Sequence, residues 1–140
     1  GMPCGPLTRV ASGGELSRIS LAVQITTTAR ASVPTLIFDE VDAGVGGGVA
    51  EIVGRCLGDL GAQGQSLCVT HLPQVASLAD QHLRVSKLTD GKQMRTSVRR
   101  LSDEERGEGI AGMLGGVKIT AATRTHAAEM LAGAGTRKAG

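Results

Sequence analysis

Three carboxylates follow directly after a short apolar run in the stretch from Thr35 to Asp42. They belong to Asp39, Glu40 and Asp42, and the run before them has the length of a buried strand. Such carboxylates belong where the strand leaves its sheet, and in open parallel sheets that edge binds ligands. Two adjacent carboxylates there can hold a metal ion and activate a water molecule. The alternative from this stretch alone is a strand followed by an acidic turn.

A second short apolar strand is predicted at 66–71, and it too ends in polar residues, Thr70 and His71. The residues between the two strands, 45–60, carry an apolar stripe at helical spacing. Strand, helix and strand at this spacing form a βαβ unit, so the two strands should be parallel. Glu40 and His71 would then share one sheet edge, where His71 is either a catalytic or a structural histidine.

The stretch 12–15, Ser-Gly-Gly-Glu, begins another helix pattern. Ser12 and Glu15 have the spacing of a capping box. Gly13 and Gly14 have no side chains that would screen the helix N-terminus, whose free N–H groups attract anions. The pair of glycines favours an anion-binding start over an ordinary capped helix. The apolar stripe of this helix is expected at Leu16, Ile19, Ser20, Val23 and Thr27.

The dipeptide Asp90-Gly91, between two strand patterns, predicts a β-hairpin over 82–101. Charge of one sign protects an edge hairpin from aggregation, and the lack of interleaved aromatic residues favours this interpretation over a nucleic-acid contact. Helices are predicted to follow from the capping box of Ser102 and Glu105, and at 120–131. Against Asp90 alone, the hairpin carries Arg84, Lys87, Lys92, Arg95, Arg99 and Arg100.

Length and composition set the limits on what this chain can be. Its 140 residues suit one domain, and with a single aromatic residue, Phe38, the core must be built from small aliphatic side chains. The net charge of +2 does not by itself indicate nucleic acid. Cys56 and Cys68 fall in apolar patterns without CxxC spacing, which favours a reducing cytoplasm. No apolar run approaches the roughly 20 residues of a membrane span, so we expect no membrane partner.

The chain divides into three parts on these patterns. Residues 1–10 form an irregular lead-in that opens on Gly1-Met2, as after removal of an expression tag. Residues 11–132 form the α/β domain. Residues 133–140 are expected to be a disordered tail.

Taken together, the motifs resemble the C-terminal half of an ABC-type ATPase head. Ala11–Glu15 resembles the signature motif usually written LSGGQ, and Leu36–Glu40 resembles a Walker B strand with its catalytic glutamate. Val41-Asp42 resembles the D-loop, and His71 the switch histidine. The implied fold is the C-terminal half of an ABC-type P-loop NTPase head: a short parallel sheet with flanking helices, plus the basic β-hairpin.

The amino-acid sequences of three longer stretches, 10–18, 38–44 and 70–76, resemble those of the RecN family of bacterial SMC-like DNA repair ATPases. That resemblance implies a protein of the bacterial cytoplasm, associated with the nucleoid. It also implies a role in DNA double-strand break repair and recombination, with DNA and a second head of a homodimer as partners. ATP and Mg²⁺ are the implied cofactors of the complete head dimer.

The resemblance also implies a role for each candidate residue. Asp39 would hold Mg²⁺, Glu40 would activate the attacking water, and His71 would contact the γ-phosphate. Asp42 would communicate across the dimer. The γ-phosphate of ATP held by the opposite head would be bound by Ser12, Gly13, Gly14 and Glu15.

One motif of the family is absent from the chain. No GxxxxGK[ST] occurs in it, and Gly46-Gly47-Gly48 lacks the Lys that a phosphate-binding loop needs. The resemblance places that Walker A loop in a missing N-terminal half of the same head. We therefore expect this chain to be inactive alone, with an apolar sheet edge exposed. Two alternatives stay open: the ATPase subunit fragment of an ABC transporter, and a non-catalytic dimerisation or DNA-docking module.

Overall fold

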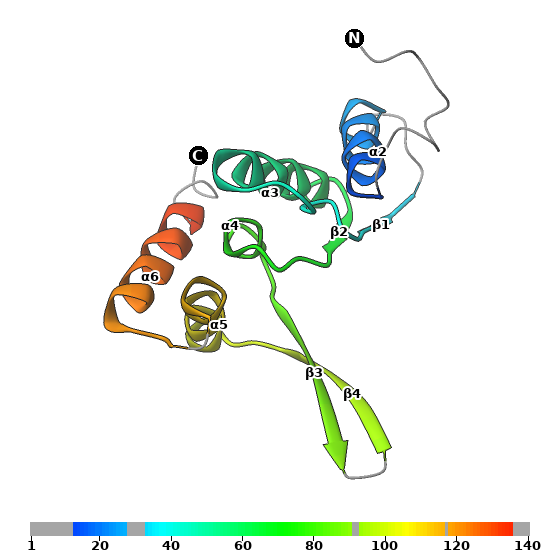
Figure 1. The fold of residues 1–140 in the computed structure, drawn as a ribbon. Helices are drawn as coiled ribbons and strands as arrows, with labels where there is room; N and C mark the ends of the chain where they lie inside the picture. The colour runs from blue at the N-terminus through cyan, green and yellow to red at the C-terminus, as the bar shows by residue number, and fades with distance from the viewer. Residues whose placement is uncertain (1–12, 28–32, 91–92, 117, 136–140) are drawn as a thin grey trace. The chain divides into compact units, whose positions relative to one another are not determined.

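A computed structural model describes residues 13–27, 33–90, 93–116 and 118–135 (Figure 1). Contacts divide the chain into two compact units, Gly1–Leu78 and Ala79–Gly140, which are described separately below. The single domain predicted over 11–132 stays a prediction, as does the lead-in at 1–10, which lies outside the described residues.

The first unit contains the predicted βαβ arrangement. Strand β1 (Thr35–Phe38) pairs in parallel with β2 (Gln65–Cys68), in a register that runs from Thr35 opposite Gln65 to Phe38 opposite Cys68. Helix α3 (Gly47–Gly61) connects the two strands. Helix α2 (Gly13–Thr27) precedes them, and the short α4 (Pro73–Ala76) follows. The parallel pairing predicted from strand spacing is confirmed.

One face of this sheet packs on the core of the unit. Phe38 and Val41 are buried there against α3, with Leu36 partly buried beside them. The helical part of the core is small and aliphatic, as the composition predicts. It consists of Leu21 from α2, Ala50, Val53, Leu57 and Leu60 from α3, and Val75 from α4.

The other face of the sheet is apolar and exposed. Successive strand residues point to opposite faces, so Ile37 and Leu67 point away from α3. Ile37 is 71% exposed and Val69, just after β2, is 62% exposed. Parallel sheets bury both faces, and the described residues cover only one of these two. The expected exposed edge is therefore accompanied by an uncovered apolar face.

The predicted apolar stripe of α2 does not face the core. Leu16, Ile19 and Val23 are all exposed, whereas Leu21, at 4% exposure, is the buried residue among the side chains of this helix that the structure describes. Leu21 comes two positions after Ile19, which is about 200° around a helix. The two apolar sides of α2 therefore point in opposite directions, and periodicity alone selected the wrong one. In α3 the predicted stripe is divided in the same way, since Ile52 is 60% exposed.

The second unit begins with the predicted hairpin. Strands β3 (Leu83–Asp90) and β4 (Gln93–Arg100) are antiparallel, from Leu83 opposite Arg100 to Asp90 opposite Gln93. Helix α5 (Asp103–Gly115) begins at the predicted capping box. The Glu105 N–H donates to Ser102 Oγ at 3.2 Å, and the Ser102 N–H donates to Glu105 Oε2 at 2.9 Å.

Helix α6 (Ala121–Gly135) packs on α5 through the buried residues Ile110, Ala111 and Ala127. Thr120 caps it, because its Oγ1 accepts from the Thr123 N–H at 3.3 Å. The helix continues past its predicted end at Leu131, so residues 133–135 of the predicted tail are helical and 136–140 lie outside the described residues.

The surroundings of two glycines in α3 predict opposite effects on stability when each glycine is replaced by alanine. A Cβ at Gly54 would lie 2.7 Å from Leu78 Cδ1 and 3.3 Å from Val75 Cα, so Gly54→Ala overpacks the α3–α4 contact and costs about 1–3 kcal/mol. At Gly58 no atom lies within 4 Å, so Gly58→Ala stabilises the helix by about 0.5–1 kcal/mol. Urea unfolding of both variants measures the difference. Equal stabilisation by both would contradict the packing of α4 on α3.

Candidate active site

The ends of β1 and β2 bring two polar segments together. Phe38 and Cys68 are register partners, and the Val69 N–H donates to the Phe38 carbonyl at 2.9 Å, which carries the pairing one step further. The chain therefore leaves both strands at the same sheet edge. Glu40 follows one strand and His71 the other, as predicted.

Glu40 has an unusual backbone conformation. Its φ is +57°, the left-handed region that side chains other than glycine seldom adopt. Two turns hold it there: Ala43 N–H donates to the Glu40 carbonyl at 3.0 Å, and Val45 N–H donates to the Asp42 carbonyl at 3.2 Å. Strain of this kind costs on the order of 1–3 kcal/mol and clusters at functional sites. The Glu40 side chain is exposed at the sheet edge, where a ligand can reach it.

Asp42 is buried and connects the two strand ends. Its side chain is 2% exposed, and Thr70 Oγ1 donates a hydrogen bond to its Oδ2. Thr70 Oγ1 also accepts from the Leu72 N–H at 3.0 Å. His71 Nδ1 lies 3.8 Å from the same carboxylate oxygen, within reach of an ion pair when the imidazole is protonated. A buried carboxylate is costly without such partners, so Asp42 and Thr70 stabilise each other's loops.

The burial of Asp42 bears on the role that sequence reasoning gave it. A carboxylate that points inward toward Thr70 is poorly placed to touch a second copy of the chain. Asp39, Glu40 and His71 are exposed at the same edge, with the His71 side chain at 75%. Three exposed groups and one buried carboxylate thus make up the cluster at the strand ends.

Helix α2 is tied to this cluster by a residue that sequence reasoning did not select. Arg18 Nη1 donates to the carbonyl oxygen of Ala43, directly after Asp42. The helix begins at Gly13, with Gly14 and Glu15 in its first turn. Ser12 lies outside the described residues, so the anion site proposed for the start of α2 stays a prediction. In the sequence, the only signal for these contacts is position: Thr70 directly precedes His71, and Arg18 follows the Ser-Gly-Gly-Glu stretch at 12–15.

Metal binding would need donors from beyond this cluster. Among the residues that the structure describes, no group of three or more His, Cys, Asp or Glu side chains could hold a metal ion. Mg²⁺ is commonly held by one or two carboxylates together with phosphate and water oxygens. The exposed carboxylate of Asp39 fits that kind of partial coordination.

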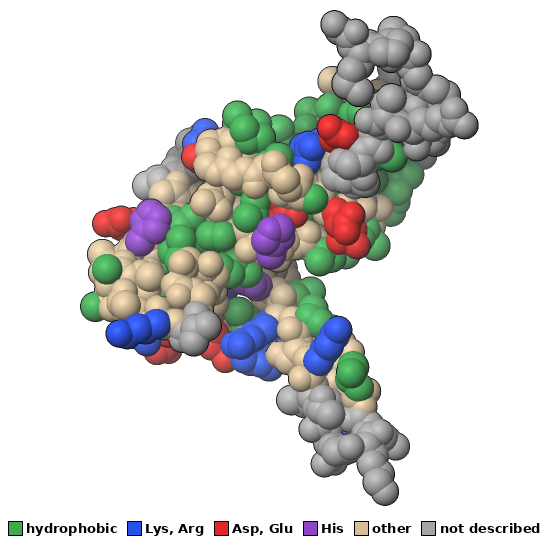
Figure 2. Space-filling view, viewed as in Figure 1, with side chains coloured by type: hydrophobic (Ala, Val, Ile, Leu, Met, Phe, Trp, Pro, Cys, Tyr) green, Lys and Arg blue, Asp and Glu red, His purple; other side chains and the backbone are tan. Residues whose placement is uncertain are grey.

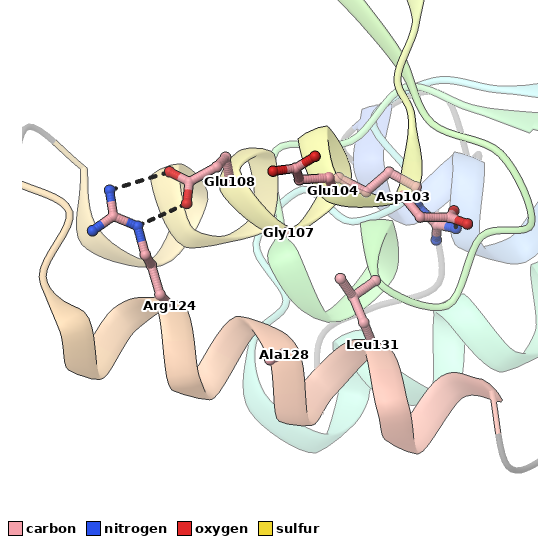
Figure 3. A pocket seen from close by; sticks show the side chains of 8 residues that line it. Asp103, Glu104, Gly107, Glu108, Arg124, Ala128 and Leu131 are labelled. Atoms are coloured by element: carbon pink, nitrogen blue, oxygen red, sulfur yellow. Dashed lines mark hydrogen bonds and ion pairs between the residues drawn. The ribbon is translucent and has the colours of Figure 1, made fainter.

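A groove elsewhere in the chain does not compete with this site. It lies between α5 and α6, has a volume of about 510 Å³, and contains none of the predicted site residues (Figure 3). Two of the charged side chains that line it form an ion pair, in which Arg124 Nε donates to Glu108 Oε1 at 2.7 Å. This ion pair joins α6 to α5. The lining residues are Asp103, Glu104, Arg106, Gly107, Glu108, Arg124, Ala128 and Leu131.

Comparison with known proteins gives a consistent result. No protein-family model matches the chain. The DNA repair protein RecN of Xylella fastidiosa (strain 9a5c) is 49% identical over 131 residues, RecN of Vibrio cholerae is 47% identical over 131, and RecN of Bacillus subtilis is 45% identical over 132. Each match covers 94% of this chain. The chain matches the C-terminal part of RecN. This confirms the resemblance predicted from the motifs.

The chain spans about a quarter of the length of these RecN proteins, 24% for those of Xylella fastidiosa and Vibrio cholerae and 23% for that of Bacillus subtilis. A solved structure from work on ATP-driven dimerization and DNA-stimulated activation of SMC ATPases is similar in fold, with a TM-score of 0.57 and 23% identity. The similarity covers 79% of this chain and 65% of that one. The predicted α/β fold of an ABC-type head, with a short parallel sheet, flanking helices and a β-hairpin, is thereby confirmed. Within the described residues, no helix has the length and apolar character needed to cross a membrane.

The thiol of Cys68, at the end of β2, reports on the cluster at the strand ends. Burial, and to a smaller extent the nearby Asp42 and Asp39 carboxylates, together raise the pKa of Cys68 to about 12. At pH 8 the thiolate fraction, and with it alkylation by iodoacetamide, should be roughly a thousandfold lower than for a thiol of ordinary pKa.

Mass spectrometry of the labelled protein measures the alkylation rate of Cys68, with the urea-unfolded protein as the reference. Asp42→Asn should lower the pKa of Cys68 and raise its native labelling rate. If Cys68 were labelled equally fast in native and unfolded protein at pH 8, the packed arrangement of the strand ends would be wrong.

Proposed function

We propose that this chain is the C-terminal part of the ATP-hydrolysing head of a RecN-type protein. It would act with a second head on a shared ATP, in DNA double-strand break repair and recombination at the bacterial nucleoid. The observation that carries the proposal is the strand-end cluster, in which a strained, exposed Glu40 stands beside Asp39 and His71. The RecN matches favour this proposal over a transporter subunit.

Glu40 is the general base in this proposal. An exposed carboxylate can accept a proton from water as the water oxygen attacks the γ-phosphorus. The bond from the γ-phosphorus to the bridging oxygen breaks, and ADP leaves with that electron pair. Phosphoryl transfer depends mainly on positioning and charge neutralisation, so a carboxylate fixed by backbone turns is suited to the task.

His71 and Asp42 have complementary parts. His71 is exposed and would donate a hydrogen bond to a γ-phosphate oxygen. Asp42 is buried beneath it and would act as a positioning residue through Thr70 and His71. Its influence on a second head would then pass through the shape of the loop, since its carboxylate does not reach the surface.

ATP and Mg²⁺ would be held only in part by these residues. Asp39 would hold Mg²⁺, directly or through water, and the bound ion would neutralise phosphate charge. The phosphate-binding loop absent from these 140 residues would come from the N-terminal half of the same head. The uncovered apolar face around Ile37 and Val69 is suited to packing against that half.

The start of α2 would act on the ATP of the other head. Gly13 and Gly14 begin the helix and offer backbone N–H groups to a γ-phosphate. Arg18, one turn further along, bonds to the loop of its own head at Ala43. A phosphate bound by one copy could thus influence the position of that copy's own Glu40.

Glu40→Gln tests the proposed base in the full-length protein. The side chain keeps its size but cannot take up the proton, so kcat for ATP hydrolysis should fall by about 10²–10⁴-fold. ATP-dependent dimerisation should be retained, since the phosphate contacts remain. Hydrolysis is followed by phosphate release, and dimerisation by light scattering.

Glu51→Gln is the matched control, because Glu51 pairs with Arg55 on the exposed side of α3 and should leave kcat unchanged. Unchanged hydrolysis in Glu40→Gln would reject the assignment of the base. It would support a non-catalytic dimerisation module instead.

A further inference from the structure

The β3–β4 hairpin has a strong excess of positive charge, with six of the 15 Lys and Arg residues of the chain. Residues 83–100 contain six Lys and Arg against one Asp, a net charge of +5. The whole chain has a net charge of +2, so the remaining residues sum to −3. Figure 2 shows Lys and Arg side chains on the visible side of the hairpin. Such a concentration of like charge on one hairpin favours binding to a polyanion.

The strand register sorts the side chains of the hairpin onto two faces, because residues directly opposite each other point to the same side. One face is largely apolar and exposed. It carries Leu83, Val85, Met94 and Val98, together with Lys87 and Arg100. The other face, here called the arginine face, carries Arg84, Arg95 and Arg99 with Ser86 and Ser97 between them. When the apolar face packs against protein, the arginine face points to solvent.

The charges of the arginine face are only partly balanced by acidic groups. Arg84 stands directly opposite Arg99, a like-charge pair that destabilises a hairpin. Arg99 Nη1 donates to both carboxylate oxygens of Glu105, at 2.7 and 2.9 Å, and Glu104 lines the same small groove at the base of the hairpin. Within the described side chains, neither Arg84 nor Arg95 forms a salt bridge. The arginines of this face without a salt bridge are therefore Arg84 and Arg95 among the described side chains.

We propose that the arginine face binds the phosphodiester backbone of duplex DNA. The choice of DNA as the polyanion rests on the proposed function. The positive charge and its distribution over the two faces follow from the sequence and the strand register alone. Single strands are bound largely by stacking on aromatic side chains, and the hairpin has none. Contacts to duplex phosphates need only basic and small hydroxyl side chains, and this face carries three Arg and two Ser among its described side chains.

The spacing of the two uncompensated arginines suits a duplex. Arg95 stands opposite Leu88, which is four residues beyond Arg84. At about 3.4 Å per residue, the two side chains begin roughly 13 Å apart along the hairpin. That distance corresponds to about four base-pair steps of one DNA strand. Binding of this kind is independent of sequence and weakens as salt rises.

The double variant Arg84→Gln/Arg95→Gln tests the proposal in the full-length protein without ATP. Fluorescence anisotropy with a labelled random-sequence duplex measures the affinity at salt concentrations from roughly 0.05 to 0.3 M. The slope of log K against log salt then reports the number of phosphate contacts. Losing two phosphate contacts should weaken binding about 60-fold near 0.1 M salt. It should also make the slope of log K against log salt shallower by about 1.8.

Lys87→Gln/Arg100→Gln is the matched control, because it removes the same charge from the opposite face. It should give a smaller loss of affinity and leave the slope unchanged. Equal losses of duplex affinity in the two double variants, or no loss in either, would overturn the proposal. Binding to anionic lipid vesicles is measured in parallel, and if Arg84→Gln/Arg95→Gln weakened it as much as it weakened duplex binding, the choice of DNA would be wrong. If the parent protein bound no duplex at all, the proposed DNA repair function would fail as well. ATP hydrolysis by the double variant, unchanged if the head folds normally, separates these outcomes from misfolding.

Discussion

The parallel pairing of β1 with β2 is the constraint on which the candidate site depends. Between the end of β1 at Phe38 and the start of β2 at Gln65 lie the 26 residues 39–64. The register of the two strands nevertheless brings Asp42 into contact with Thr70. Helix α3 makes this possible by crossing over the sheet and filling one face with small aliphatic side chains. A shift of the register would separate the carboxylates from His71. The chemistry of the site is therefore a consequence of how the core packs.

The cluster is held by hydrogen bonds where it is buried and is exposed where it would act. Asp42 is held by Thr70 inside the unit, while Glu40 is held in a left-handed conformation by backbone turns and stays exposed. Arg18 extends this order to α2 through the Ala43 carbonyl. Strain at Glu40 is tolerated because Val41 and Asp42 on its C-terminal side are buried and fix the loop. These links give a physical path between the start of α2 and the proposed base.

Much of this arrangement could be predicted from sequence, because strand ends, caps and turn residues act locally. The parallel strands, the hairpin and the capping box at Ser102 are confirmed by the structure. The apolar side of α2 was predicted wrongly, since periodicity shows that a helix has an apolar side but not which neighbour covers it. The burial of Asp42 and the bond from Arg18 are tertiary contacts that no local pattern contains. The roles assigned to the site residues, among them Asp39, Glu40 and His71, stay predictions, and Ser12 lies outside the described residues.

The central claim is that the base of one head and the helix start of another act on a single ATP. Two inactive full-length variants test it most directly: Glu40→Gln, and Gly14→Asp, whose carboxylate favours the helix but repels phosphate. Mixed dimers would contain one site with Glu40 and Gly14 both intact. An equal mixture should recover about a quarter of the parent hydrolysis rate, as random pairing of symmetric subunits requires. A rate no higher than the sum of the two variants measured alone would contradict the account.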